Sequence, residues 1–476
     1  MVLQRLCLLV AITVVFVALP GSNEAAGEEI ALDQALEWAR NYAPLRAEYQ
    51  ARRDHAQWQQ YRADRAFWPS LTAQSLLAPV PAEADPSRID ENLDEILALN
   101  IGPYFRQTIR LTMPVYTFGR ISKAQELAAI GVDVSKLEEE VALLDHLLRT
   151  KRAYYGRQMS RAFQELLAEG DRLVKEALEE MEEDRAFGEA NFEVDDLRRL
   201  QIFNAELDGM LLDNRRLGEL TDAALRYLTD RDHSFRVPAF RSDAASVELG
   251  ELQEYLQAAR EHRPEIKQLA MAVEARRIQE DLAKREFYPN FFAALDFGYG
   301  WSTESPAFQR VCRRLEPGGE CINSETLFTR PYSNPFDTLT FGIALGMQWR
   351  LDFPQQYGRL RESQALVRQI ESQQERALGA LLLEVEEKWR TARDAQERVQ
   401  IESRRLDAAR RWRNQYGLQQ ELRGSGDISE VIAPLRAYYE ARVAELEAAH
   451  SYLVARAELA RAVGVEDLSA LQDQRN

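Results

Sequence analysis

The feature that most constrains this chain is an internal duplication that spans nearly all of its 476 residues. Three landmarks of the first half recur in the second at one constant offset: Leu32–Leu36 matches Leu252–Leu256, Ala43-Pro44 matches Arg263-Pro264, and Phe67-Trp68-Pro69 matches Phe287-Tyr288-Pro289. A fourth, Phe118-Gly119-Arg120, matches Tyr357-Gly358-Arg359 at a larger offset, so the second half carries an insertion after Trp301. Self-similarity of this kind indicates that each half supplies the same structural elements in the same order.

The first residues have the pattern of a secretory signal. Arg5 precedes an apolar run from Leu6 to Leu19, and small residues follow at Ala25–Gly27. The run is shorter than the roughly 20 residues that a membrane-crossing helix needs, so we expect a cleaved signal peptide at 1–27, with a retained anchor as the alternative. The remaining chain is then divided into a first repeat, a second repeat and a C-terminal tail: 28–238, 239–464 and 465–476.

Each repeat is predicted to contain one short helical segment followed by a long helix and its partner. Leucine and other apolar residues keep a 3-4-3-4 spacing from Leu127 to Leu148, which is typical of a coiled-coil seam. No proline interrupts the segment that follows Gly119, and a helix rises by about 1.5 Å per residue, so this helix would reach roughly 100 Å. The predicted helices are 30–67, 119–186 and 192–229 in the first repeat, and 247–287, 358–422 and 428–463 in the second.

Between the short and the long helices the hydrophobic period changes to two. Apolar residues occupy every odd position from Leu339 to Leu351, and Phe291 to Trp301 alternate in the same way. This strict alternation predicts strands with one apolar face, at residues 70–79, 104–116, 290–301 and 338–352. Strands of this length can cross a bilayer when tilted. A water-soluble β-sandwich is the alternative, although long helices separate the strand pairs.

Composition excludes several classes of function. The net charge of -17 argues against nucleic acid as a partner. The five histidines are scattered without the spacing of a metal site, and Gly424-Ser-Gly426 precedes no phosphate-loop lysine. We therefore expect no cofactor, no metal and no enzyme activity.

Four strands cannot close a barrel, and an open edge in lipid leaves backbone groups unsatisfied at several kcal/mol each. The chain is therefore expected to oligomerise; two copies would give eight strands and three would give twelve with room for a lumen. Physical reasoning alone leaves both open.

The duplicated order of elements resembles the TolC-like outer-membrane efflux family. The matching residues are Pro114–Arg120, Pro354–Arg359, the tip residues Phe187-Gly188 with Asp195–Leu197, and Gly424–Val431. The resemblance implies a mixed fold, in which four strands per chain complete a twelve-stranded membrane β-barrel in a homotrimer and long helices form a periplasmic α-helical barrel. It also implies an outer-membrane location, a periplasmic adaptor protein and an inner-membrane pump as partners, and passive export of cargo.

The resemblance also implies where the functional residues lie. Glu430 matches an acidic position that constricts the tunnel entrance in the family, whereas Ala433 stands where a second acid is expected. Asp195 and Asp196 are the candidate replacements for that acid. The turns at Gly188, Gly424 and Gly426 are the expected adaptor contacts. Glu430 also fits a capping box that starts at Asp427, and Pro434 is expected to bend its helix.

Two readings of the cysteines and of the whole chain stay open at this point. Cys312 and Cys321 flank the turn-forming sequence Pro317-Gly318-Gly319, and in an exported chain they are expected to form a disulfide rather than remain two thiols. For the chain as a whole, the alternative to a channel is a periplasmic adaptor or structural coiled-coil protein. That alternative explains the helical hairpins but not the alternating strands.

Overall fold

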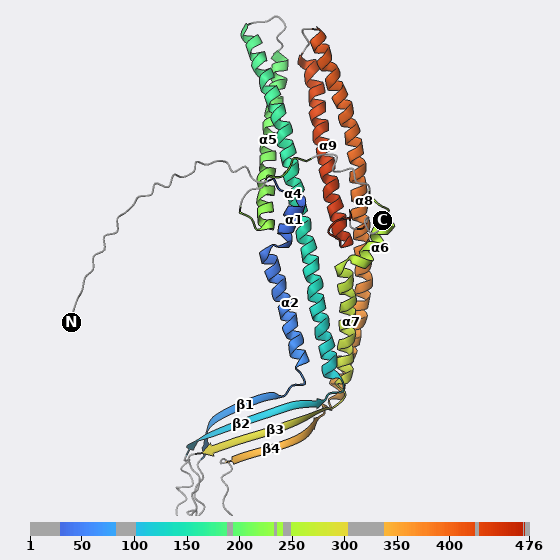
Figure 1. Ribbon diagram of the computed structural model, residues 1–476. Coiled ribbons are helices and arrows are strands. Elements are labelled where there is room, and N and C mark those ends of the chain that lie inside the picture. Colours follow the sequence, from blue (N-terminus) through green and yellow to red (C-terminus); the bar gives the residue numbers. More distant parts are fainter. Residues whose placement is uncertain are drawn as a thin grey trace, which may run out of the picture. The chain divides into compact units, whose positions relative to one another are not determined.

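The computed structural model describes residues 29–81, 101–187, 194–232, 236–240, 249–302, 338–423, 428–469 and 471. They form two compact units. The sheet unit comprises Tyr49–Glu138 and Glu265–Leu378, and the helical unit comprises the described residues of Met1–Glu48, Glu139–Pro264 and Gly379–Asn476. In chain order the elements are α1 (Leu32–Arg40), α2 (Ala43–Asp64), β1 (Ser70–Pro81), β2 (Ile101–Tyr116), α4 (Arg120–Phe187), α5 (Val194–Thr229), α6 (Leu252–His262), α7 (Pro264–Arg285), β3 (Asn290–Ser302), β4 (Thr338–Gln348), α8 (Phe353–Arg423) and α9 (Ile428–Val463) (Figure 1).

The short helical segment of each repeat is broken in two, which corrects the continuous helices expected at 30–67 and 247–287. The break falls between α1 and α2 in the first repeat and between α6 and α7 in the second. Pro44 and Pro264 explain it, because proline removes a backbone donor and disfavours the helical conformation of the residue before it. Arg263, which precedes Pro264, is extended with φ -65° and ψ 117°. Both prolines stand in the first turn of the following helix, where the missing N–H costs little.

The last strand and the helix after it also differ from the expectation. β4 ends at Gln348 rather than at 352, and α8 begins at Phe353 rather than at 358. Pro354 stands in the first turn of α8, where proline is tolerated. The side chain of Gln356 donates to the backbone carbonyl of Arg350 at 2.7 Å and secures this helix start.

The strands form one antiparallel sheet in the order β1-β2-β3-β4. β1 pairs with β2, and β3 pairs with β4, so each repeat contributes one hairpin. The two repeats meet where β2 pairs with β3, as Phe105 faces Trp301 and Leu111 faces Leu295. A register shift between Pro114 and Tyr116 pairs Tyr116 with Phe291. The duplication of the sequence is thus a duplication of the hairpin.

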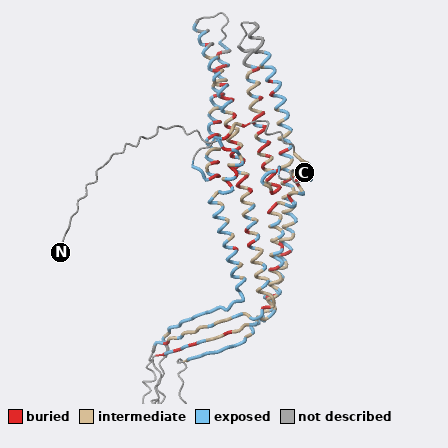
Figure 2. The backbone as a smooth tube through the Cα atoms, viewed as in Figure 1, coloured by how far each residue is buried: buried red, intermediate tan, exposed pale blue. Residues whose placement is uncertain are grey.

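The core of the helical unit is a set of small clusters along the helix seams, seen as the buried segments of Figure 2. One cluster packs α4 against α5 through Val174, Leu197 and Leu207 among others. Another joins the repeats, since residues of α4 such as Leu166 contact residues of α9 such as Tyr452. Many buried residues of α9 are alanines, which let helix backbones approach closely. Among the described residues, none of the helices combines the length and the apolar character that a membrane-crossing helix requires.

Candidate functional site

The two faces of the sheet differ sharply in chemistry. Successive residues of a strand point to opposite faces, and the register places the odd-numbered apolar residues of neighbouring strands on one face. Ile109 pairs with Phe297, which pairs with Phe341. Most large side chains of this face are exposed, and the exposed fraction reaches 74% for Ile343 and 84% for Leu345. We call this surface the apolar face.

The opposite face, which we call the polar face, carries mostly small and polar side chains, with Leu76 and Phe292 as large apolar exceptions. The carboxylate of Asp296 accepts from the guanidinium of Arg110 across the β2–β3 pair. Gly298 is buried, and a Cβ added there would lie 2.4 Å from the hydroxyl of Thr340. Across the β3–β4 pair, Asp296 faces Gly342. This face therefore suits contact with water, whereas the apolar face has the chemistry expected of a surface in hydrocarbon.

Both edges of the sheet are open within the described residues. β1 pairs only with β2, and β4 pairs only with β3. An open edge presents a row of backbone N–H and C=O groups that another strand can pair.

Aromatic residues gather at the ends of the strands that adjoin the helices. Tyr116 pairs with Phe291 at this end, and Trp349 donates its indole N–H to the carbonyl of Phe287 at 3.0 Å. The ring of Phe353 lies 6.4 Å from that of Trp349. Most of these rings are exposed. Trp and Tyr are enriched at membrane interfaces, where one end of the side chain contacts lipid and the other contacts water. The members of this aromatic belt are Phe67, Trp68, Tyr116, Tyr288, Phe291, Trp349 and Phe353.

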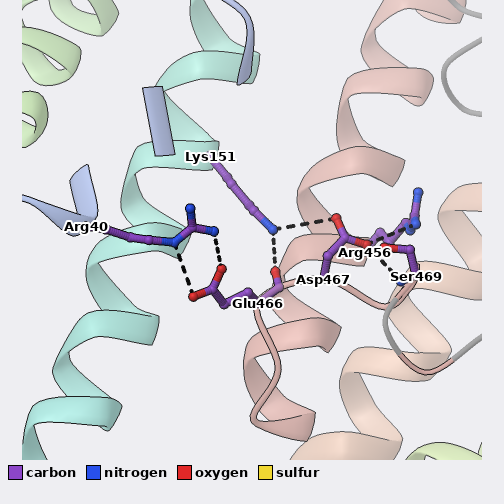
Figure 3. A network of polar contacts seen from close by, with 6 residues as sticks. All are labelled: Arg40, Lys151, Arg456, Glu466, Asp467 and Ser469. Carbon is purple, nitrogen blue, oxygen red and sulfur yellow. Dashed lines mark hydrogen bonds and ion pairs between the residues drawn. The ribbon is translucent and has the colours of Figure 1, made fainter. Parts of the chain in front are cut away.

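In the helical unit, a polar network ties the second repeat to the first (Figure 3). Lys151 of α4 is only 5% exposed. Its ammonium group donates to the backbone carbonyl of Glu466 and lies 3.8 Å from the carboxylate of Asp467. Arg40 of α1 pairs with the carboxylate of Glu466, and Arg456 of α9 lies 3.3 Å from Asp467. The residues after α9 are thereby fixed to α1 and α4.

Burial sets the titration behaviour of this network. Desolvation lowers the pKa of Lys151, although Asp467 and Glu466 act in the opposite direction. For Asp467, burial is the largest influence and raises the pKa, but the backbone N–H of Ser469 and the cations Lys151 and Arg456 together bring it below its usual range. The carboxylate of Asp467 therefore stabilises the fold above its ordinary pKa, and this contribution is lost as the pH falls through the lowered value.

The structure describes the predicted site residues only in part. Asp195 is exposed in the first turn of α5, where Asp196 is its neighbour, and Glu430 lies in the first turn of α9. The side chains of Asp196 and Glu430 lie outside the described part, so the expected gate stays a prediction. Gly188, Gly424, Gly426, Cys312 and Cys321 also lie outside the described residues. Pro434 is buried, and α9 continues through it.

Among the residues that the structure describes, no cluster of three or more His, Cys, Asp or Glu side chains is arranged to hold a metal ion. The surface features of the sheet are an apolar face, a polar face, two open edges and an aromatic belt.

Comparison with known proteins identifies the class of this architecture. The CusC channel gives a TM-score of 0.70 at 13% identity, over 94% of this chain and 96% of that chain. The open MtrE outer membrane channel of Neisseria gonorrhoeae gives 0.67 at 15%, over 91% and 89%. The outer membrane protein VceC of Vibrio cholerae gives 0.65 at 17%, over 91% and 96%. The chain thus has the TolC-like fold of outer-membrane channels.

A family model matches part of the sequence. The model of the outer membrane efflux protein family matches residues 255–465, which is most of the second repeat. No curated protein matches the chain in sequence. The second repeat of this chain is therefore similar in sequence to the outer membrane efflux protein family.

Sequence reasoning missed the residues that hold the helical unit together. Lys151, Arg263 and Glu458 are all buried or nearly so, yet in the sequence they stand among the other charged residues of amphipathic helices. For Arg263 the sequence did carry one indication of a special role. This charged residue stands directly before Pro264 in a repeated dipeptide, where the first half has Ala43 before Pro44.

Proposed function

We propose that this chain forms a trimeric channel-tunnel in the outer membrane, which serves as the passive exit duct of a tripartite efflux or type I secretion system. The observation that carries the proposal is the sheet, with its exposed apolar face and its two open edges. In hydrocarbon each unpaired backbone group costs several kcal/mol, so β1 of one copy must pair with β4 of the next. Three copies would close a barrel of twelve strands around the polar face, with a lumen inside.

The long helices suit the periplasmic tunnel of the proposed channel. The helical unit extends each repeat as a helical hairpin, and in the proposed trimer these hairpins form the periplasmic tunnel. An adaptor protein would contact the turns that include Gly188, Gly424 and Gly426, and an inner-membrane pump would supply the energy. The segments 80–103 and 302–336 would then face outside the cell, where a Cys312–Cys321 disulfide would close a short ring in the second of them.

The alternative function is that of a periplasmic adaptor or structural coiled-coil protein. It would account for the helical hairpins, but it gives no role to Ile343, Leu345 and the other exposed residues of the apolar face. The family match also favours a channel. The channel is therefore the better proposal.

The trimer is tested by the mass of the assembly. The 476 residues have a mass of 54.6 kDa, and removal of the expected signal peptide makes the mature chain lighter. We expect the protein extracted from outer membranes in mild detergent to have three times the mass of the mature chain, plus bound detergent. Native mass spectrometry or mass photometry measures it. A single-chain mass in a preparation that still conducts ions would contradict the proposal, and so would extraction without detergent.

The entrance gate is tested by ion selectivity. If Glu430, Asp195 and Asp196 line the constriction, the variant that combines Glu430→Gln, Asp195→Asn and Asp196→Asn should lose severalfold in cation over anion permeability, because fixed negative charge in a narrow passage attracts cations. Reversal potentials of single channels in planar bilayers measure this ratio. Asp213→Asn on α5, whose carboxylate is 75% exposed, is the matched control. Unchanged selectivity in the triple variant would leave Glu430 only its capping role.

A further inference from the structure

At the end of the sheet that adjoins the helices, the sheet unit contains a hollow of about 640 Å³. It lies where β2 passes into α4 and where α7 passes into β3, and Phe67, between α2 and β1, completes its lining. Its lining is aromatic, with small polar residues and a single cation, Arg285, and it holds no carboxylate: Phe67, Tyr116, Thr117, Phe118, Gly119, Ser122, Arg285 and Tyr288.

The hollow depends on an unusual backbone turn. Phe118 has φ 50°, which is rare for a residue with a side chain, and Gly119 has φ 74°. The guanidinium of Arg285 donates to the carbonyl of Phe118. A Cβ added to Gly119 would lie 2.7 Å from a nitrogen of that guanidinium. The ring of Phe118 stacks on Tyr288 at 4.9 Å and meets Tyr116 edge-on at 4.7 Å. These contacts hold a strained turn in place, and such strain is often kept at functional sites.

The duplication shows that the scaffold does not require this turn. The matching residues of the second repeat, Tyr357 and Gly358, lie inside α8, which begins at Phe353. The repeated residues therefore form a strained turn in the first repeat and part of a regular helix in the second. Within the described residues, the left-handed turn that borders the hollow occurs at this landmark of the first repeat and not at the matching landmark of the second.

The surroundings of the hollow indicate what it binds. The register shift pairs Tyr116 with Phe291 of the apolar face, and the ring of Phe118 lies 6.4 Å from that of Phe291. The aromatic rim thus continues into the apolar face, which in the proposed function faces hydrocarbon. Aromatic belts of membrane proteins lie at the level of the lipid headgroups, and a guanidinium is well suited to phosphate oxygens.

We propose that this hollow binds one phospholipid, with its phosphodiester group on Arg285 and an acyl chain along Phe291 and the apolar face. The inference rests on the proposed function for the presence of lipid. Neighbouring copies that pair with β1 and β4 would extend the sheet at its edges, whereas most of the lining comes from the β2–α4 and α7–β3 junctions between those edges. The site would therefore remain open to lipid in the assembled barrel.

The test measures retained lipid by native mass spectrometry of the full-length protein in detergent micelles that contain phosphatidylglycerol. Two variants remove the site by different means. Ser122→Trp fills the hollow and leaves Arg285 intact, whereas Arg285→Gln removes the cation. The control is Arg276→Gln on the same helix, an exposed residue that donates only to Gln279, at 2.8 Å, among its described hydrogen bonds.

We expect the wild type and Arg276→Gln to retain one phosphatidylglycerol per chain, and both site variants to retain at least tenfold less. Diacylglycerol with the same chains should not be retained. Lipid retention by Ser122→Trp at the level of the wild type would overturn the proposal, as would displacement by inorganic phosphate at constant ionic strength. Insertion into vesicles, measured separately by flotation, tests the proposed function, so a protein that inserts but retains no lipid refutes only this inference.

Discussion

Replacing Ile343 by lysine is expected to remove most of the assembled protein from the outer membrane. Ile343 lies near the middle of β4 on the apolar face, where it pairs with Leu295 and is 74% exposed. A lysine that faces lipid at the bilayer midplane costs about 2–4 kcal/mol. Since about 1.4 kcal/mol is a factor of ten in an equilibrium constant, the inserted population should fall by more than about tenfold.

The neighbouring residue provides the matched control. Gly342 lies at the same depth on the polar face, it faces Asp296, and a Cβ added to it meets nothing within 4 Å. A lysine at this position has room and an acidic neighbour, so Gly342→Lys should assemble nearly as the wild type does. Quantitative immunoblots of outer-membrane fractions measure both variants. If both lysines reduce assembly equally, the apolar face does not face lipid.

Replacing Arg263 by methionine is expected to destabilise the helical unit by about 1–3 kcal/mol, the usual cost of leaving buried hydrogen-bonding groups without a partner. The residue is 4% exposed. Its guanidinium donates to the carbonyl of Ala462 at 2.9 Å and to the carboxylate of Glu384 at 2.6 Å. Methionine would leave these acceptors without their donor. Gly464, with φ 90°, packs against the backbone of residue 263, which the substitution leaves in place.

Denaturant-induced unfolding of the purified protein, followed by circular dichroism, measures this loss. Arg260→Met is the control, since Arg260 is exposed in α6, the helix that Arg263 follows, and its replacement should change the unfolding free energy by less than about 0.5 kcal/mol. A similarly small change for Arg263→Met would show that its hydrogen bonds contribute little to stability.

Periodic features of the molecule could be predicted from the sequence because they are local. The alternation of Phe291 to Trp301 and of Leu339 to Met347 specifies which residues share a face of β3 and β4, whatever else surrounds the strands. The spacing of the seam that starts at Leu127 likewise indicated the long helix α4. The breaks before Pro44 and Pro264 are also local, and proline chemistry alone would have placed them.

The candidate sites also divide into those that the local sequence predicts and those that depend on distant residues. The apolar face followed from the alternation, because a strand carries its pattern of exposure in its own sequence. The gate residues Asp195, Asp196 and Glu430 were assigned by resemblance and stay predictions. Nothing local distinguished Lys151 from the solvated lysines of other helices, since its burial depends on residues after α9 that lie far away in the chain.

The sequence by itself therefore determined the duplicated order of elements and the faces of the strands, because hydrophobic period is a property of each segment. Tertiary structure alone decided which charged residues are buried, because burial requires distant elements to cover a side chain. It also decided the conformation of the repeated landmark. Phe118-Gly119 adopts a strained turn held by Arg285 and Tyr288, whereas Tyr357-Gly358 follows a helix that has already begun at Phe353.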